Sequence, residues 1–226
     1  MRSHRYARGF LEICCDADSG LGALGSEYGF TTKRITKMER FDTTEGVGIA
    51  MDFVDKCKRC DVWGSLMCTA WCSWNHLNAS RLGPAFAAEL AWRRRESLRM
   101  VRSFERVALR AISRGGRAHF EWPAFCAGWA QVVVKRMVSR LKLAKARFDG
   151  CAFGVHASDS LLALKPWCVA TSCPALASAL SAHRCSRLHR HGQLHGIQAL
   201  HSGHYPDAMC RCILASLRDA AACLRP

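Results

Sequence analysis

Apolar residues follow two patterns along this chain: short continuous runs and longer segments with helical spacing. Short apolar runs bounded by polar residues or glycine are typical of buried strands. They predict strands over residues 10–15, 61–67, 117–121, 145–153 and 167–172. Residues 33–39 alternate between polar and apolar side chains, which predicts a further strand ending at Glu39.

The longest helical pattern follows Pro84 and ends before Gly115 and Gly116. Its apolar positions recur every three or four residues, as one face of a helix requires; they are Phe86, Leu90, Leu98, Val101, Phe104, Val107 and Ala111. The same spacing predicts helices over residues 125–141 and from about 206 to 224. A small-residue turn after the first strand also runs into a helix.

Strands alternating with helices predict an α/β fold, a Rossmann-like, doubly wound and mostly parallel sheet with helices on both faces. The length of 226 residues favours one domain over 1–226. Its C-terminal segment, 183–226, is basic and rich in His and Cys.

Charge is distributed unevenly. Residues 1–80 hold equal numbers of basic and acidic side chains, so the whole net charge of +15 lies in residues 81–226. Such asymmetry favours a polyanionic partner. Five arginines repeat at three or four residues on the long helix, as Arg95, Arg99, Arg102, Arg106 and Arg110. A solvated helix face is the commonest reason for such a stripe, but with this net charge we expect phosphate contact.

The 14 cysteines and the N-terminus indicate where the protein resides. The basic start at 1–8 is followed by an apolar run that is too short for a signal peptide and contains Glu12. We therefore expect reduced thiols in an intracellular protein. No apolar run approaches the roughly 20 residues that a membrane helix needs, so we expect no membrane partner.

Four polar segments fall at the predicted strand ends, where ligands bind in such sheets. The first is the turn with Asp16, Asp18, Gly20 and Gly22, and the second contains Glu39 and Asp42. The third is 68–74, which begins with Cys68, and the fourth is 120–123, which contains Glu121. Each alone is more often a surface turn or a core residue, but their order at successive strand ends favours one site.

These segments resemble the cytosine carbon-5 DNA methyltransferases, and most closely the divergent domains of retroelement-type polyproteins. The resemblance is carried by 12–22, 68–71 and 121–123, with 148–154 and 165–167 as further matches, and it covers roughly residues 10–215. It implies the fold of class I S-adenosylmethionine-dependent methyltransferases, DNA more readily than RNA as substrate, and a nuclear location in a eukaryote.

The resemblance also assigns roles to residues. Cys68 would add to carbon 6 of cytosine and so make carbon 5 nucleophilic, and Glu121 would hold or protonate the ring nitrogen. S-adenosylmethionine would be held by Glu12, Asp16, Asp18, Gly20, Gly22, Glu39 and Asp52, and Lys165 would contact nucleic acid. The base would be flipped out of its stack. Leu66 and Met67 stand where the family has two prolines, and Trp122 stands where it has Asn, so we expect weak or absent activity.

Two metal sites are alternatives. Cys57, Cys60, Cys68 and Cys72 lie within sixteen residues and could bind one zinc ion. The second candidate is the stretch with His183, Cys185, His189, His191, His195, His201 and His204. Its spacing matches no known finger, and we interpret it as a solvated basic loop. A nucleic-acid-binding module without catalysis is the remaining alternative.

Overall fold

A six-stranded sheet with the strand order β2-β1-β3-β4-β6-β5 organises the protein. The structure, a computed structural model, describes residues 8–157, 161–194, 196, 199 and 202–222. The strands are β1 (Arg8–Ile13), β2 (Phe30–Ile35), β3 (Cys60–Gly64), β4 (Arg117–Pro123), β5 (Ala144–Asp149) and β6 (Pro166–Thr171). The first four pair in parallel, whereas β6 runs antiparallel to both β4 and β5. The prediction of a mostly parallel α/β sheet is thus confirmed, with β6 as the exception.

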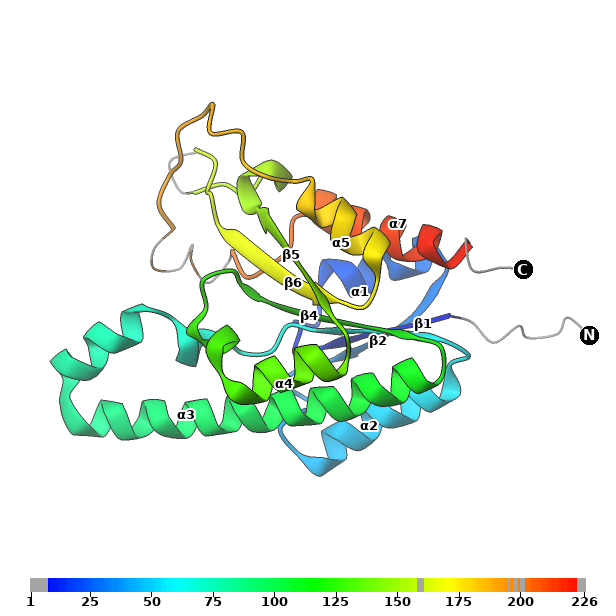
Figure 1. Ribbon diagram of the computed structural model, residues 1–226, viewed down its shortest axis with the longest axis horizontal. Helices are drawn as coiled ribbons and strands as arrows, with labels where there is room; N and C mark the ends of the chain where they lie inside the picture. Colours follow the sequence, from blue (N-terminus) through cyan, green and yellow to red (C-terminus); the bar gives the residue numbers. More distant parts are fainter. Residues whose placement is uncertain (1–7, 158–160, 195, 197–198, 200–201, 223–226) are drawn as a thin grey trace, which may run out of the picture.

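Helices cover both faces of this sheet (Figure 1). On one face lie α2 (Thr44–Lys56), α3 (Trp74–Ser113) and α4 (Val132–Arg140). On the other lie α1 (Gly20–Leu24), α5 (Pro174–Ser181) and α7 (Asp207–Ala222). Alternate residues of β1 enter the two cores, since Leu11 packs toward α2 and α3 and Phe10 toward α1 and α7. Because both faces are buried, these strands appear in the sequence as continuous apolar runs.

The long helix begins earlier than its pattern predicted. It runs from Trp74 to Ser113 and is kinked at Gly83, which has a φ of 80°. A residue before proline is disfavoured in helical conformation, and glycine adopts the positive φ without steric cost. Pro84 therefore starts the second, straight part of α3 rather than the whole helix.

Other predicted boundaries were wrong as well. The strand predicted over 61–67 ends at Gly64, so Cys68 lies four residues beyond the end of the strand. The strand predicted over 33–39 ends at Ile35, because the Glu39 carboxylate accepts hydrogen bonds from the backbone N (2.8 Å) and Oγ (2.7 Å) of Thr36 and closes a turn. The strand predicted over 145–153 ends at Asp149, where a 3-10 turn begins. The helix predicted over 125–141 begins only at Val132, after another such turn.

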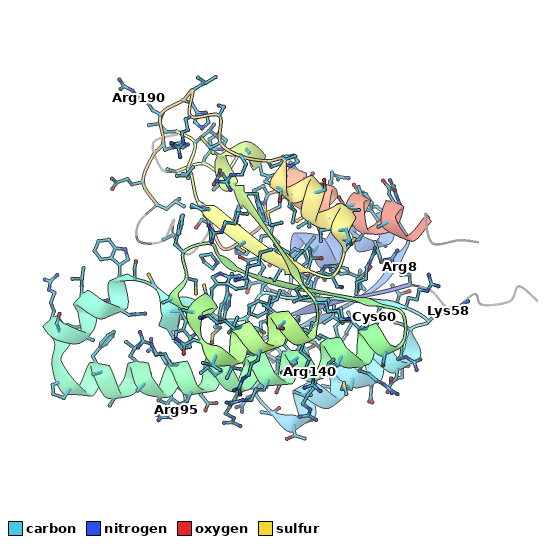
Figure 2. The ribbon with its side chains drawn as sticks, in the orientation of Figure 1. Arg8, Lys58, Cys60, Arg95, Arg140 and Arg190 are labelled. Atoms are coloured by element: carbon cyan, nitrogen blue, oxygen red, sulfur yellow. The ribbon has the colours of Figure 1, made fainter. Side chains whose placement is uncertain are left out.

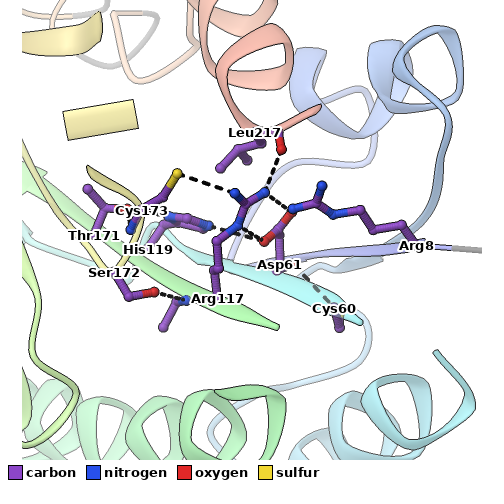
Figure 3. A network of polar contacts seen from close by, with 10 residues as sticks. Arg8, Cys60, Asp61, Arg117, His119, Thr171, Ser172, Cys173 and Leu217 are labelled. Carbon is purple, nitrogen blue, oxygen red and sulfur yellow. Dashed lines mark hydrogen bonds and ion pairs between the residues drawn. The ribbon is translucent and has the colours of Figure 1, made fainter. Parts of the chain in front are cut away.

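A buried ionic network ties the amino ends of the central strands together (Figure 3). The fully buried Asp61 carboxylate on β3 binds Arg8 of β1 at 2.7 Å and Arg117 of β4 at 2.7 and 3.1 Å. Arg117 also donates to the backbone oxygen of Leu217 on α7 at 2.6 Å. The network thus joins three strands to α7, whose Leu217 lies 100 residues after Arg117 in the sequence.

None of the described helices is both long and apolar enough to cross a bilayer.

Candidate functional site

A cavity of about 480 Å³ opens where β1, β2 and β3 end. Its walls come from the segments after these strands and from the first half of the straight part of α3; they include Cys14, Cys15, Asp16, Thr36, Lys37, Arg40, Phe41, Asp42, Met67, Thr69, Ala70, Trp92 and Met100. Cys14 and Arg40 have positive φ values of 61° and 49°, which are unusual for residues other than glycine. Three of the four polar segments predicted to meet at this edge of the sheet contribute to the wall, whereas the segment 120–123 does not.

Of the predicted cofactor residues in the first turn, Asp16 lines the cavity and Glu12 holds the turn itself. The buried Glu12 carboxylate accepts hydrogen bonds from the Ser19 hydroxyl and from the Gly22 backbone N, the latter at 3.1 Å. Burial raises the pKa of Glu12, while these hydrogen bonds counteract the shift. Gly20 and Gly22 allow α7 and Arg34 to approach closely, since a Cβ at Gly22 would lie 2.1 Å from Nε of Arg34. Asp18 is exposed in the same turn.

Of the three acidic residues after β2 that concern the site, Glu39, Asp42 and Asp52, one lines the cavity and two do not. The Glu39 carboxylate is bound to Thr36, and the hydrogen bonds lower its pKa. It does not line the cavity, whereas Asp42 does, next to Arg40 at 3.0 Å. Asp52 is exposed on α2 and also lies outside the cavity wall. The carboxylate available to a ligand in this part of the site is therefore that of Asp42.

The segment that contains Cys68 is fixed by side chains from α3 and β4. The indole nitrogen of Trp122 donates to the backbone oxygen of Leu66 at 2.7 Å, and Arg94 donates to that of Ala70 at 3.2 Å. Ser97 donates to the backbone oxygen of Met67 at 3.3 Å. These three bonds define the path of a loop that has no proline.

Cys68 lies four residues after the end of β3, and Glu121 lies near the end of the neighbouring strand β4. The two side chains are near enough for the Glu121 carboxylate to affect the thiol electrostatically, but neither of them lines the cavity. Burial, and then the nearby Glu121 carboxylate, raises the pKa of the Cys68 thiol to about 12. Burial also raises the pKa of Glu121 to about 7, against the opposing effects of Tyr205 and Lys165. At neutral pH the thiol is therefore protonated, while Glu121 is present in both its protonated and its ionised form.

Tyr205 is the site residue that the sequence patterns missed. Its hydroxyl donates to the Glu121 carboxylate at 2.8 Å and lies 2.7 Å from the Ser65 hydroxyl. The Trp63 indole also donates to it at 3.3 Å. Tyr205 is separated from Glu121 by 84 residues, in a His-rich basic segment that carries no periodic signal.

Lys165 lies beside this pair rather than with the arginines of α3. Its ammonium group donates to the hydroxyl of Ser202 at 3.0 Å and to the backbone oxygen of the same residue. Burial lowers the pKa of Lys165, while Glu121 and Cys68 raise it. The buried surroundings of Glu121 thus contain a cation, a phenol and a thiol.

The arginine stripe is exposed along α3, on the side turned away from the sheet, as Figure 2 shows for Arg95. Arg99 pairs with Glu96 at 3.0 Å, and Arg110 pairs with Asp55 at 2.7 Å. Arg95, Arg102 and Arg106 have no ion pair among the described residues. Their charges are therefore available to a partner.

The four cysteines of the first zinc alternative do not converge. Cys57 and Cys60 lie together beside Gly9, at the amino end of β3. Cys68 and Cys72 follow the other end of the same strand. An extended strand advances about 3.3 Å per residue, so the two pairs are too far apart to share one ion. The structure therefore contradicts this alternative, in which the four cysteines would share one zinc ion.

Comparisons with protein-family models, with curated proteins and with solved structures found no match to this chain.

Proposed function

We propose that this chain is an S-adenosylmethionine-dependent methyltransferase-like protein that acts on cytosine in nucleic acid with low turnover. The observation that carries the proposal is that Cys68 and Glu121 lie near the ends of adjacent strands and influence one another electrostatically, while Met67 and Thr69, the neighbours of Cys68, line the cavity. The strand order supports it, because an antiparallel last strand inserted beside β4 is also the arrangement of class I methyltransferases. Since a fold hosts many functions, the site carries more weight than the fold.

The cavity suits the proposed cofactor in size and lining. A volume of about 480 Å³ lies in the range of small-molecule sites. Asp42 and Asp16 would bind the ribose hydroxyls and the ammonium group, and Phe41 and Met100 would contact the adenine. When bound, S-adenosylmethionine would supply an electrophilic methyl group. Positive φ at Cys14 and Arg40 fits this role, because strained backbone is concentrated at functional sites.

The reacting pair would divide the chemistry between a thiol and a carboxyl. The Cys68 thiolate would form a bond to carbon 6 while Glu121 gives its proton to the ring nitrogen. A pKa of about 7 suits Glu121 for this proton transfer. A thiol with a pKa of about 12 must first lose its proton, and only a small fraction is ionised at neutral pH. This is the physical reason why we propose low turnover.

The experiment is a mechanism-based trap with a cofactor test beside it. DNA that contains 5-fluorocytosine, incubated with S-adenosylmethionine and the purified protein, should form a covalent adduct detected by mass spectrometry. Cys68→Ser should abolish the adduct, whereas Cys72→Ser, four residues away and exposed, should retain it. Calorimetric titration with S-adenosylmethionine should show binding that Asp42→Asn weakens. No adduct and no heat of binding together would refute the proposal.

A second candidate is binding of nucleic acid without catalysis. It is favoured by the raised pKa of Cys68 and by the unpaired arginines of α3. The same experiment separates the two, because a binding module would retain DNA and form no adduct.

A further inference from the structure

Four metal-binding side chains converge at the end of the molecule where β5 ends. Cys151, Cys185, His189 and His191 each bring one donor atom within 4.8 Å of all the others. Cys151 lies in the 3-10 turn after β5, and the other three lie in the loop that follows α5. This is the one group of three or more such side chains found in the described part of the chain.

Two distances between these donor atoms suit ligands that surround one ion tetrahedrally. Sγ of Cys185 lies 3.3 Å from Nε2 of His191 and 3.8 Å from Nε2 of His189. Zinc bonds of about 2.3 Å to sulfur and 2.0 Å to nitrogen place tetrahedral ligands roughly 3.3 to 3.8 Å apart. Two thiols with two imidazoles are a soft set that selects zinc over magnesium or calcium.

The surrounding hydrogen bonds hold the loop in this position. The backbone N of Arg187 donates to Sγ of Cys185 at 3.2 Å. The Asp149 carboxylate accepts from the backbone N of Cys185 at 2.9 Å and from Nε of Arg184 at 3.0 Å. Such outer contacts orient the ligands of metal sites, and here they come from the end of β5 itself.

The C-terminal end of the loop is held by backbone contacts with Leu162. His191 forms a bridge with Leu162, and the backbone N of Gly192 donates to the oxygen of Leu162 at 2.9 Å. Arg190, between the two histidines, is exposed and points away from the body of the protein (Figure 2). The loop therefore turns its Cys and His side chains inward and its arginine outward.

We infer that Cys151, Cys185, His189 and His191 form a structural zinc site that fastens the 185–191 loop to the end of β5. Four protein ligands leave no position for substrate, which is the mark of a structural site. The segment that follows contains Ser202 and Tyr205, which contact Lys165 and Glu121. The ion would therefore also help to hold the segment that carries Tyr205, the hydrogen-bond partner of Glu121. The inference does not depend on the proposed enzymatic function.

The test is the metal content of the full chain, purified under reducing conditions without chelator. Elemental analysis should find one zinc per chain. Cys185→Ser and His191→Gln should each reduce the zinc content at least tenfold, with circular dichroism confirming the fold. Cys72→Ser and His204→Gln are matched controls at exposed positions and should keep the full zinc content.

Cobalt gives an independent readout on the wild-type protein and remains decisive if a variant does not fold. Replacing zinc by cobalt(II) should produce the strong visible absorption of tetrahedral cobalt bound by two thiolates. Absence of both zinc and this absorption would overturn the inference. So would a disulfide between Cys151 and Cys185 in the protein purified with reductant, or equal loss of zinc in the control variants.

Discussion

At the scale of single residues, the environment of Glu121 determines how the candidate site behaves. The carboxyl group on β4 is buried beside the Tyr205 hydroxyl, with Lys165 nearby. Desolvation disfavours its charged form more than the hydroxyl and the ammonium group favour it, so its pKa rises from 4.5 to about 7. The same burial keeps the Cys68 thiol protonated.

Glu121→Gln should change the pH dependence of stability. Because the folded-state pKa lies above the ordinary value, the protonated carboxyl stabilises the folded protein at low pH, and this contribution is lost as the pH rises from about 4.5 to about 7. The loss is on the order of 3 kcal/mol. Urea unfolding at pH 5, 6, 7 and 8 should show a flatter profile for the variant.

Glu89→Gln, on the exposed surface of α3, controls for the change from carboxyl to amide. Its pH profile should follow that of the wild type. Parallel profiles of the wild type and Glu121→Gln would contradict the raised pKa.

At the scale of elements, α3 has two separate roles. Its apolar side packs on β3 and β4 through Val101, Phe104 and Val107. Its opposite side carries the arginines. The part of α3 before Gly83 lies beyond the ends of the strands (Figure 1). One helix thus joins the core of the sheet to the surface that we propose for phosphate.

Reversing Arg102 and Arg106 to Glu should weaken binding to duplex DNA. Each lost phosphate contact should reduce the slope of log affinity against log salt by about one, because fewer counterions are released. Fluorescence anisotropy at several salt concentrations measures this slope.

The matched control reverses Lys58 and Arg59, which are also exposed and change the net charge equally. They lie before β3, at the opposite end of the strands from the candidate site, as Figure 2 shows for Lys58. Equal effects of the two double variants would mean that overall charge, not this surface, binds DNA.

At the scale of the whole molecule, the Asp61 network holds elements from distant parts of the sequence together. It joins β1, β3, β4 and α7 (Figure 3). These strands begin here, whereas the candidate site lies near their other ends. Both arginines are largely buried, with side-chain exposures of 19% for Arg8 and 12% for Arg117. The Asp61 carboxylate is the acidic group that compensates the positive charges of both arginines.

Asp61→Asn should therefore destabilise the protein strongly. Removing one partner of a buried ionic network leaves uncompensated charge and costs about 3 to 5 kcal/mol. Asp55→Asn makes the same chemical change in an ion pair whose side chains are 42% and 45% exposed, and it should cost much less, because solvent screens an exposed pair. Denaturant unfolding compares the two variants, and similar losses would show that the network contributes no more than a surface pair.

The spacing of apolar residues in the sequence was sufficient to predict most helices and strands. It also predicted which two strands are neighbours at the candidate site. Apolar runs located the strands, and the pairing of β3 with β4 through the long helix was confirmed. That pairing puts Cys68 and Glu121 in the same region of the protein, where the carboxylate affects the pKa of the thiol. Local patterns could predict these strands because a parallel sheet that is buried on both faces needs consecutive apolar residues in each strand. They could predict the neighbours because strands joined by one helix usually lie side by side.

The sequence by itself thus determined the layers of the protein, the asymmetry of its charge and the strand ends at which the candidate site lies. Only the tertiary structure decided the direction of β6, the binding of Glu39 to Thr36, and the contact of Tyr205 with Glu121. It also separated Cys57 and Cys60 from Cys68 and assembled Cys151 with Cys185, His189 and His191. The physical reason is that these contacts are specific polar interactions, some of them between residues far apart in the chain. Periodicity reports whether a side chain is buried but not which partner it meets there.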